Sequence, residues 1–480
     1  MNFGINKKCL TGRKKIQIPV NEITKEVIEE YLPQIMATFY ENCEEIKYLK
    51  EYKNGKQDIL NKTRQVQESI NNKVVENHAF NIVEFVKGYL VGNPIQITQR
   101  LSSELTDEVT YLNTYMKDVN KAKKDTLTVE NIVTYGKSLY LTLPKVEGVE
   151  NIEKESPYDI YQIDGTEGDV IYSSMLNKSK IGCFVITEVK DSKSKKTIKL
   201  VTIYTKSAKY LVYLDNVKAK GKYEIKQEEF ILPFVPMTEY YFFESRIGLI
   251  EVVLSTLNLL NRISSNEIDD IEQFVNNIIV LINQDITQED VKFLRENKLL
   301  KMKSTNPQFP ADVKFLQQAL SHGDINNFYN RVYVMMMNIV AIPKSSDNAT
   351  SGGDTGQARL LGEGWTLADQ RAMTYENMFE ASELENMKVA LYICRQILKC
   401  PIKNLYSSDL KVTFNINKSD NMLVKSQTML NLNTLNLPKE IIAEKSQLFN
   451  DPIEVAKIWE EYDINNEKNI SINNQDNRTK

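Results

Sequence analysis

The chain has 480 residues, of which 42% are hydrophobic and 26% are charged. This composition is typical of folded proteins and excludes the disordered, collagen-like and disulfide-scaffold classes. Lys and Arg number 60 and Asp and Glu number 64, which gives a net charge of −4. Proteins that clamp nucleic acid usually carry a basic excess, so any contact with DNA must be local or weak.

The number and spacing of the cysteines and histidines bear on possible metal sites, and the length of the apolar runs bears on secretion and membrane insertion. The five cysteines are scattered and never spaced as C-x-x-C, which argues against a disulfide framework and a zinc ribbon, and makes a reducing cytoplasm the default compartment. With only His78 and His322 present, a His-rich metal site is excluded. No run approaches the roughly 20 apolar residues of a membrane span, and the first twenty residues lack a signal-peptide core. We therefore expect neither secretion nor membrane insertion.

Two segments resemble ligand-binding motifs, and both fail on spacing. Gly136-Lys137-Ser138 is similar to the end of a phosphate-binding loop, but the position five before Gly136 is Asn131, where that loop needs glycine. The acidic run 164–169 lacks the order of ligands of an EF-hand and predicts a polar turn between strands. No catalytic constellation is present, so we predict a protein that is not an enzyme and that has no cofactor and no metal site.

The first half of the chain predicts two helices and then a β-rich region. Apolar residues three to four apart indicate helices over 21–52, with Pro33 as a kink or break, and over 74–90. Residues 138–240 are the only β-rich portion. β-Branched and aromatic residues there predict antiparallel strands over 138–143, 181–189, 197–205 and 208–214.

The second half predicts long helices. Helical phase runs from Arg246 to about residue 275 and again over 324–342, where Pro343 ends it. A third helix, over 355–398, would span about 66 Å at 1.5 Å per residue, with Gly362 and Gly364 as a bend. The chain then predicts a strand over 412–416, helices over 426–433 and 452–462, and a disordered polar tail over 463–480.

The first of the long helices is acidic. Residues 244–272 carry six acids and two arginines, a local net charge of −4. One interpretation of this excess is a solvated helix face. Another is the wall of a channel for DNA, because each phosphate that a cation neutralises adds a counterion-release gain and therefore drag on sliding.

Several separated segments together carry a resemblance to a known family. They are Asn54-Gly55, the run Gly88-Tyr89-Leu90-Val91-Gly92-Asn93-Pro94, Tyr135-Gly136-Lys137-Ser138, Phe230 to Tyr240, Glu244 to Glu251 with the following Leu257 to Asn266, Ser351-Gly352-Gly353, and Asn450-Asp451-Pro452. In this order they resemble the portal proteins of tailed bacteriophages, which form a ring at the head vertex. The similarity covers about residues 20 to 462.

The resemblance implies an α+β, mainly helical subunit in a ring of about twelve around a tunnel. It places an N-terminal arm at 1–19, a wing at 20–244 and 355–415, a stem at 246–275 and 323–342, a clip at 276–322, a tunnel loop at 343–354, a crown at 416–462 and the disordered tail at 463–480. Two long helices around a compact insert, followed by a polar loop and a long bent helix, agree with this order.

The resemblance also implies a function and partners. The ring would be the channel through which double-stranded DNA is packaged, retained and ejected, and would join head to tail. Expected partners are other copies of the chain, the terminase large subunit that supplies the energy, the major capsid and scaffolding proteins, and a head–tail adaptor. The expected location is the portal vertex of the virion, and the host cytoplasm during assembly.

Two sets of residues are candidate sites under this resemblance. The polar tunnel loop after Pro343 would approach DNA through Lys344, Ser345, Ser346, Asn348 and Thr350. Cations of the clip would dock the packaging ATPase or the adaptor, namely Lys292, Arg295, Lys298, Lys301 and Lys303. The alternatives are an outward-facing loop and a solvated charged helix, respectively.

Two other classes of protein stay open from the residues alone. A non-portal helical scaffold or tail connector would also combine long helices with no catalytic residues. A divergent enzyme is the second alternative, and nucleotide turnover by the isolated chain would favour it.

Overall fold

The computed structural model contains two units, which are described separately. It describes residues 11–64, 68–100, 105–145, 148–190, 197–214, 223–230, 232–275, 279–282, 288, 312–315, 322–343, 364–414, 416, 422–435, 437–446, 448–449 and 455–463. The larger unit holds residues 6–54, 77–254 and 338–480, and the smaller one holds 55–76 and 255–337 together with 1–5. Close to half of the described residues are helical and the rest include several sheets, which agrees with the predicted α+β class.

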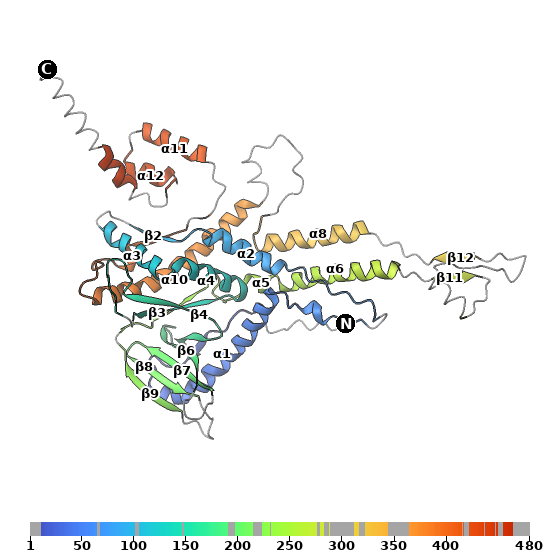
Figure 1. The fold of residues 1–480 in the computed structure, drawn as a ribbon, viewed down its shortest axis with the longest axis horizontal. Helices are drawn as coiled ribbons and strands as arrows, with labels where there is room; N and C mark the ends of the chain where they lie inside the picture. The colour runs from blue at the N-terminus through green and yellow to red at the C-terminus, as the bar shows by residue number, and fades with distance from the viewer. Residues whose placement is uncertain are drawn as a thin grey trace, which may run out of the picture. The chain divides into compact units, whose positions relative to one another are not determined.

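The larger unit is built on two main sheets (Figure 1). One has the strand order β1 (Ile16–Ile18), β5 (Gly168–Ser173), β6 (Lys180–Lys190), β7 (Thr197–Thr205), β8 (Ala208–Tyr213) and β9 (Glu224–Glu229), parallel only between β1 and β5. The other is antiparallel, in the order β10 (Met237–Tyr240), β3 (Ser138–Pro144) and β4 (Tyr158–Ile163). A short pair joins β13 (Leu410–Thr413) to β2 (Gln96–Gln99).

Helices cover these sheets. Helix α1 (Lys25–Lys53) buries its apolar side against the six-stranded sheet, where the rings of Phe39 and Phe184 meet edge to face at 5.1 Å. Helix α10 (Trp365–Gln396) packs on the three-stranded sheet, where the ring centres of Phe379 and Tyr240 lie 5.0 Å apart. The remaining helices of this unit are α2 (His78–Val91), α3 (Thr106–Asp118), α4 (Lys121–Tyr135), α5 (Leu249–Val252), α11 (Met422–Thr434) and α12 (Lys439–Ser446), and residues 455–463 are also helical.

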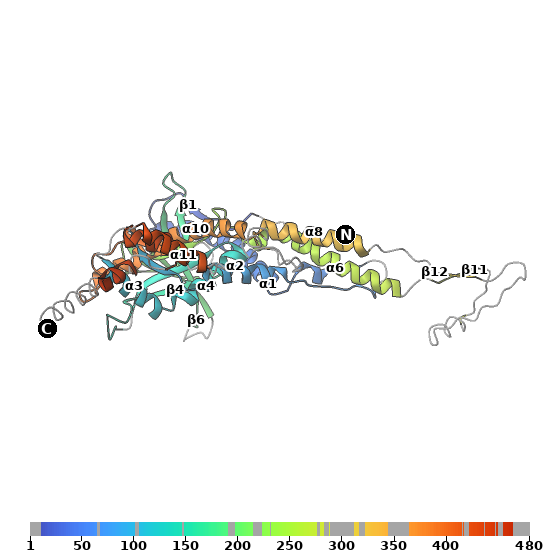
Figure 2. The ribbon, with the colours of Figure 1, turned by 90° about the horizontal axis from the view of Figure 1, so that it is seen from above.

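The smaller unit contains two long helices. Helix α6 (Leu254–Val275), which enters this unit at Ser255, and helix α8 (His322–Ile339) lie side by side in Figures 1 and 2. Strands β11 (Ile279–Ile282) and β12 (Asp312–Phe315) lie between α6 and α8 in the sequence, and they pair antiparallel with each other. The short 3₁₀ helix η2 (Asp58–Asn61) belongs to the segment 55–76 of the same unit.

Most predicted elements are confirmed, but the start of the first long helix differs from its prediction. The helices over 21–52, 74–90 and 324–342 correspond to α1, α2 and α8. The five predicted strands correspond to β3, β6, β7, β8 and β13, the last of which spans 410–413 and not 412–416. Arg246, however, is not helical: its φ is 53° and its guanidinium is held by Glu239. The helix therefore starts at Leu249, and it breaks at Val253 before α6 begins.

Candidate functional site

Helix α6 buries a polar face in the smaller unit. Asn261, Ser265 and Asp269 are four residues apart, so they share one side of the helix, and all three are buried. The segment 57–76, which is described except for residues 65–67, lies along this side. Its backbone amides donate to the three side chains: Glu76 to Asn261 at 2.9 Å, Val74 to Ser265 at 2.9 Å, and Asn72 to Asp269 at 2.7 Å. The segment is thus fixed by side chains of α6 in place of a strand partner.

An ion pair secures the middle of this contact. The Lys62 ammonium donates to Asp269 at 2.7 Å, and both side chains are almost fully buried. Burial opposes ionisation of Asp269, but the hydrogen bonds from Lys62 and Asn72 outweigh it and lower the pKa of this carboxyl. Removing the Asp269 carboxylate would leave the Lys62 ammonium as an unpaired buried charge, which costs about 3–5 kcal/mol. Asp269 itself has a second cation, Arg64, at 3.6 Å.

Glu76 connects the two helices of the smaller unit. Its carboxylate accepts one hydrogen bond from the Ser264 hydroxyl of α6 and one from the Tyr329 hydroxyl of α8. Burial, together with the bond to this carboxylate, raises the pKa of Tyr329. The segment 57–76 therefore holds α6 and α8 beside each other.

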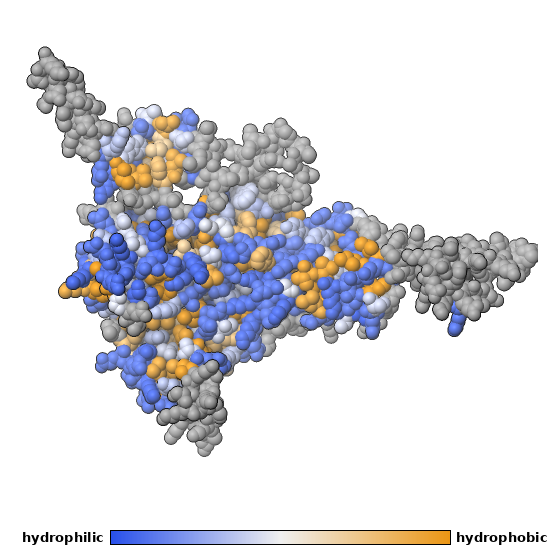
Figure 3. Space-filling model, in the orientation of Figure 1, coloured by the Kyte–Doolittle hydropathy of each residue, from blue (hydrophilic) through white to orange (hydrophobic). Residues whose placement is uncertain are grey.

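Apolar side chains are exposed on the same two helices. Ile268 and Ile271 of α6 are 39% and 44% exposed, and Phe328 and Met335 of α8 are 41% and 50% exposed. Figure 3 shows apolar surface gathered over α6 and α8. The two helices thus bury apolar residues such as Leu257 and Met336, but they also leave large apolar side chains partly exposed to solvent.

In the larger unit, buried charges fix the chain just before α6. The Arg13 guanidinium donates to Glu251 of α5 at 2.7 Å, and both side chains are buried. Burial raises the pKa of Glu251 to about 7, although Arg13 opposes this shift. Arg246 donates to both carboxylate oxygens of Glu239, at 3.2 and 2.8 Å. Bidentate pairs fix the relative orientation of the two side chains, so the backbone over 239–251 is held in one conformation.

The segment that resembles a phosphate-binding loop has a structural role in the same place. Gly136 ends α4 with φ of 93°, and a Cβ there would lie 2.0 Å from the carbonyl oxygen of Arg246. Lys137 is buried and donates to Asp169. Glycine is thus required for a close backbone approach, and Lys137 is already paired.

A second buried polar cluster lies between α4, α10 and the three-stranded sheet. Lys121 donates to Asp125 and, at 2.9 Å, to Glu383, and its ammonium lies 4.9 Å from the centre of the Tyr140 ring. Tyr240 donates to Glu383 at 2.6 Å. Burial raises the pKa of Asp125 to about 6, against the opposing effect of Lys121. One cation faces two carboxyls here, so the cluster favours holding one proton.

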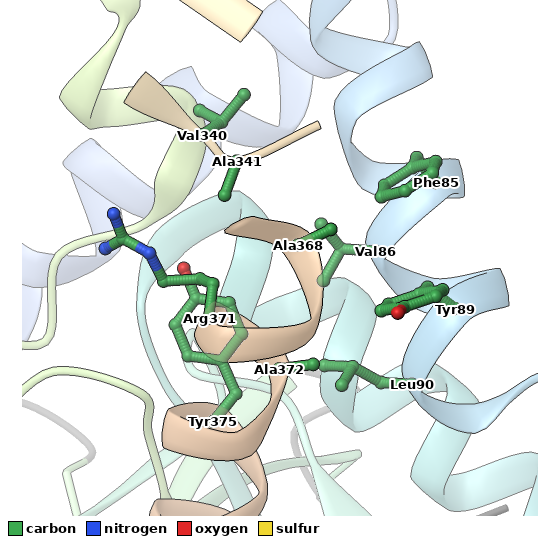
Figure 4. Close-up of a pocket in the computed structure, with 10 residues that line it drawn as sticks. All are labelled: Phe85, Val86, Tyr89, Leu90, Val340, Ala341, Ala368, Arg371, Ala372 and Tyr375. Carbon is green, nitrogen blue, oxygen red and sulfur yellow. The ribbon is translucent and has the colours of Figure 1, made fainter. Parts of the chain in front are cut away.

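A small cavity is enclosed by α2, the residues after α8 and the start of α10 (Figure 4). Its volume is about 20 Å³, and it is lined by Phe85, Val86, Tyr89, Leu90, Val340, Ala341, Ala368, Arg371, Ala372 and Tyr375. This is space for about one water molecule, and small-molecule sites usually need several hundred Å³. The cavity is therefore a packing feature and not a nucleotide site.

Most of the candidate residues predicted from sequence fall outside the described residues. These are the tunnel-loop residues Lys344, Ser345, Ser346, Asn348 and Thr350, the clip cations Lys292, Arg295, Lys298, Lys301 and Lys303, and Gly362. Gly364 is described: it is the N-cap of α10, with φ of 87°. The sequence predicted a bend at this residue within a helix over 355–398. In the structure Gly364 instead directly precedes the first residue of α10.

The other motifs occupy ordinary structural positions. The acidic run 164–169 contains the predicted turn between β4 and β5, which spans 164–167, and the Thr166 amide donates to Asp164 there at 2.9 Å. Among the described residues, no group of three or more His, Cys, Asp or Glu side chains could hold a metal ion. No described helix has the length and apolar character needed to cross a membrane.

Comparison with known proteins defines the class. The fold combines sheets with a two-helix unit that exposes apolar residues, as expected of a subunit that packs against others. A family model described as "Phage portal protein, SPP1 Gp6-like" matches residues 33–469, nearly the whole chain. The chain belongs to this phage portal protein family, whose members are structural, oligomeric proteins of the phage capsid. No curated protein matches the chain.

Proposed function

We propose that the chain forms the ring-shaped channel for double-stranded DNA at the portal vertex, with about twelve subunits. The observation that carries this proposal, beside the family, is the exposure of Ile268, Ile271, Phe328 and Met335 on α6 and α8. A helix pair of this kind gains stability when its apolar residues are covered, and neighbouring copies in a ring would cover them.

In this proposal each part of the chain takes a portal role. The helices α6 and α8 form the stem, and residues 276–322 between them form the clip. Residues 343–354 form the tunnel loop, 20–244 and 355–415 the wing, and 416–462 the crown. The ring packages, retains and releases the genome and joins head to tail, while a separate terminase supplies the energy.

The overall charge supports passage of DNA without a tight grip. Each subunit carries −4, so about twelve copies carry about −48. A wall with a cationic excess would release counterions at many phosphates and resist sliding, whereas an acidic or neutral wall avoids this drag.

Deletion of the coding sequence from the phage genome tests the proposed function. We expect the deletion to give heads that contain no DNA, and complementation by the intact chain to restore filled heads. Filled heads in the absence of the chain would contradict the proposal.

Within the channel, we assign DNA contact to the tunnel loop through Lys344, Ser345, Ser346, Asn348 and Thr350. The polar character of these side chains after Pro343 supports this assignment. Replacing Lys344 and Asn348 by Ala should reduce the DNA retained per head while ring assembly is unchanged. Normal retention by that variant would remove the loop from the proposal.

At the clip, we assign docking of the terminase or adaptor to Lys292, Arg295, Lys298, Lys301 and Lys303. The excess of cations over this stretch supports the assignment, because charge complementarity steers association. Charge reversal at Arg295 and Lys298 should weaken adaptor binding to purified rings in a salt-dependent manner. Undiminished binding would count against the assignment.

A further inference from the structure

Two cysteines meet where α10 ends. Cys394 lies in the last turn of this helix, and Cys400 follows it after a tight turn. Both residues are buried, and both are free thiols. The Ile397 amide donates to the Cys394 carbonyl at 3.2 Å, and the Cys400 amide donates to the Ile397 carbonyl at 3.1 Å. These bonds fold the chain back on itself, so the Cys394 thiol reaches the Cys400 sulfur and donates a hydrogen bond to it.

Contacts with the neighbouring helix α3 hold this turn in place. The Glu108 carboxylate accepts hydrogen bonds from the amides of Lys403, Asn404 and Leu405, at 2.8, 3.0 and 3.1 Å. Arg395 of α10 donates to the Leu405 carbonyl at 2.9 Å. The backbone that follows the second cysteine is therefore fixed from two sides, by α3 and by the end of α10. The fold itself thus holds the two thiols against each other.

The groups around Cys400 favour its thiolate form. The hydrogen bond from Cys394 lowers the pKa of Cys400 to about 6 and outweighs the opposing effect of burial. The Ile402 amide donates a further bond to this sulfur, and the Lys403 ammonium adds a positive charge nearby. The Tyr115 hydroxyl oxygen lies 3.7 Å from the sulfur. Because the thiolate is the nucleophilic form of cysteine, Cys400 is the reactive member of the pair.

Two other cysteines show what burial does to a thiol elsewhere in this protein. Burial raises the pKa of Cys43 to about 11 and that of Cys183 to about 12. Cys43 contacts the Thr166 carbonyl at 3.8 Å, and Cys183 lies within strand β6. Thiols of this kind stay protonated and are inert. Cys400 behaves differently because Cys394 lies beside it.

We propose that Cys394 and Cys400 form a reversible oxidation site, at which hydrogen peroxide converts the two thiols into a disulfide. The Cys400 thiolate attacks one oxygen of the peroxide and becomes a sulfenic acid, while the other oxygen leaves as hydroxide and takes up the proton that Cys400 released. The Cys394 thiol then attacks the Cys400 sulfur, so that the S–S bond forms and the S–O bond breaks with loss of water. The thiols lose two electrons and two protons in total, and the peroxide becomes two molecules of water.

The disulfide ties the last turn of α10 to the chain that leads into β13. Thiol reductants of a cytoplasm keep such a pair reduced, and an oxidising environment closes it. The oxidation site requires only the fold of the larger unit. It therefore goes beyond the proposed function and does not depend on the formation of a ring.

Peptide mapping of the full-length chain tests the site. Trypsin cleaves after Arg395 and Lys399, so the two cysteines fall on separate peptides, 389–395 and 400–403, which only a disulfide joins. The purified chain is reduced, freed of reductant, treated with hydrogen peroxide and digested without reductant. Mass spectrometry should find the two peptides joined, with the loss of two hydrogen atoms. Dithiothreitol should separate them again.

Substitutions separate the roles of the two sulfurs. Dimedone, which labels sulfenic acids, should label Cys400 in Cys394→Ser, because the intermediate then has no thiol to react with. It should leave Cys394 unlabelled in Cys400→Ser, since burial keeps that thiol protonated. Cys43→Ala changes a buried cysteine outside the pair and is the matched control, in which the two peptides should join as in the wild type. Circular dichroism establishes that each variant is folded.

The wild type alone is sufficient to overturn the proposed oxidation site. The proposal fails if the two peptides stay separate at a peroxide concentration that oxidises the same cysteines in the urea-unfolded chain. A disulfide from Cys400 to any other cysteine, or between two chains, would overturn it as well. Dimedone on Cys394 in Cys400→Ser, with none on Cys400 in Cys394→Ser, would contradict the order of the two steps. None of these results bears on the ring, and failure to form a ring would leave the oxidation site intact.

Discussion

Gly136 is a residue at which a single hydrogen atom is the only side chain the fold accepts. Its φ of 93° is unfavourable for other residues, and a Cβ would meet the backbone of Arg246. Gly136→Ala should destabilise the protein by about 3 kcal/mol, because both strain and a backbone clash result. Gly88, exposed within α2 with nothing near its would-be Cβ, is the matched control. Gly88→Ala should stabilise the protein by about 0.5–1 kcal/mol in urea unfolding.

If Gly136→Ala were as well tolerated as Gly88→Ala, the close approach of the two backbone segments would be wrong. The comparison is direct, because both substitutions add the same methyl group.

Asp125 should make stability depend on pH. Burial raises its pKa in the folded state from 3.8 to about 6, so the folded protein holds a proton there that the unfolded chain has lost. This proton contributes at most about 3 kcal/mol to the free energy of unfolding. The contribution is fully present below about pH 4 and is lost as the pH rises through about 6. Urea unfolding at pH 4.5 and 7 should show the wild type losing stability relative to Asp125→Asn.

The difference in unfolding free energy between the wild type and Asp125→Asn cancels the contributions of other titrating groups. One such group is Glu239, whose pKa is lowered to about 2 by Arg246 against the effect of burial, so that its contribution to stability changes with pH in the opposite direction. An unchanged difference between pH 4.5 and 7 would show that Asp125 titrates normally.

At the scale of elements, the polar face of α6 should control the segment 57–76. Asp269→Asn keeps the shape of the side chain but leaves the Lys62 ammonium without its buried partner. Backbone amides of Asn72 and Val74 should then exchange their hydrogens at least tenfold faster by mass spectrometry, because their acceptors lie on the weakened contact. Asn266→Ala, at an exposed position of α6, should leave that exchange unchanged. Equal protection in both variants would mean that the ion pair does not hold the segment.

The elements differ in how well their sequence predicts them. Strand β7 was predicted with its observed bounds, because its β-branched and aromatic residues form an uninterrupted local pattern. The acids of 244–272 were interpreted as a solvated helix face or a channel wall, yet Glu251 and Asp269 are buried. Their partners Arg13 and Lys62 lie more than 200 residues away in the sequence, and no local pattern indicates such a contact.

Three helices, α3, α4 and α12, and a backbone reversal were also not predicted. Helix α4 buries Lys121 and Asp125, and the partner of Lys121 on α10, Glu383, lies 262 residues away in the sequence, so no local pattern indicates this contact. Helix α3 precedes it and was likewise not predicted. Arg246 continued a helical pattern in the sequence, but its pair with Glu239 holds it in a left-handed conformation. The two candidate sites, in the tunnel loop and the clip, stay predictions.

At the scale of the whole molecule, the exposed apolar residues of α6 and α8 should decide assembly. Ile271→Lys with Phe328→Lys adds charges to the surfaces that neighbouring copies would cover, and should leave folded monomers in place of rings. Met175→Lys with Leu176→Lys, at exposed apolar positions between β5 and β6, is the matched control and should assemble normally. Circular dichroism would establish that both variants are folded. Rings formed by the first variant would exclude these residues from the subunit contact.

The mass of the purified protein in solution, with negative-stain images of the same fraction, tests the central claim most directly. About twelve subunits of 55.4 kDa would give about 665 kDa and a closed ring with a central opening. This is the result that the portal assignment predicts. A compact dimer at every protein concentration, with no rings in the images, would contradict it.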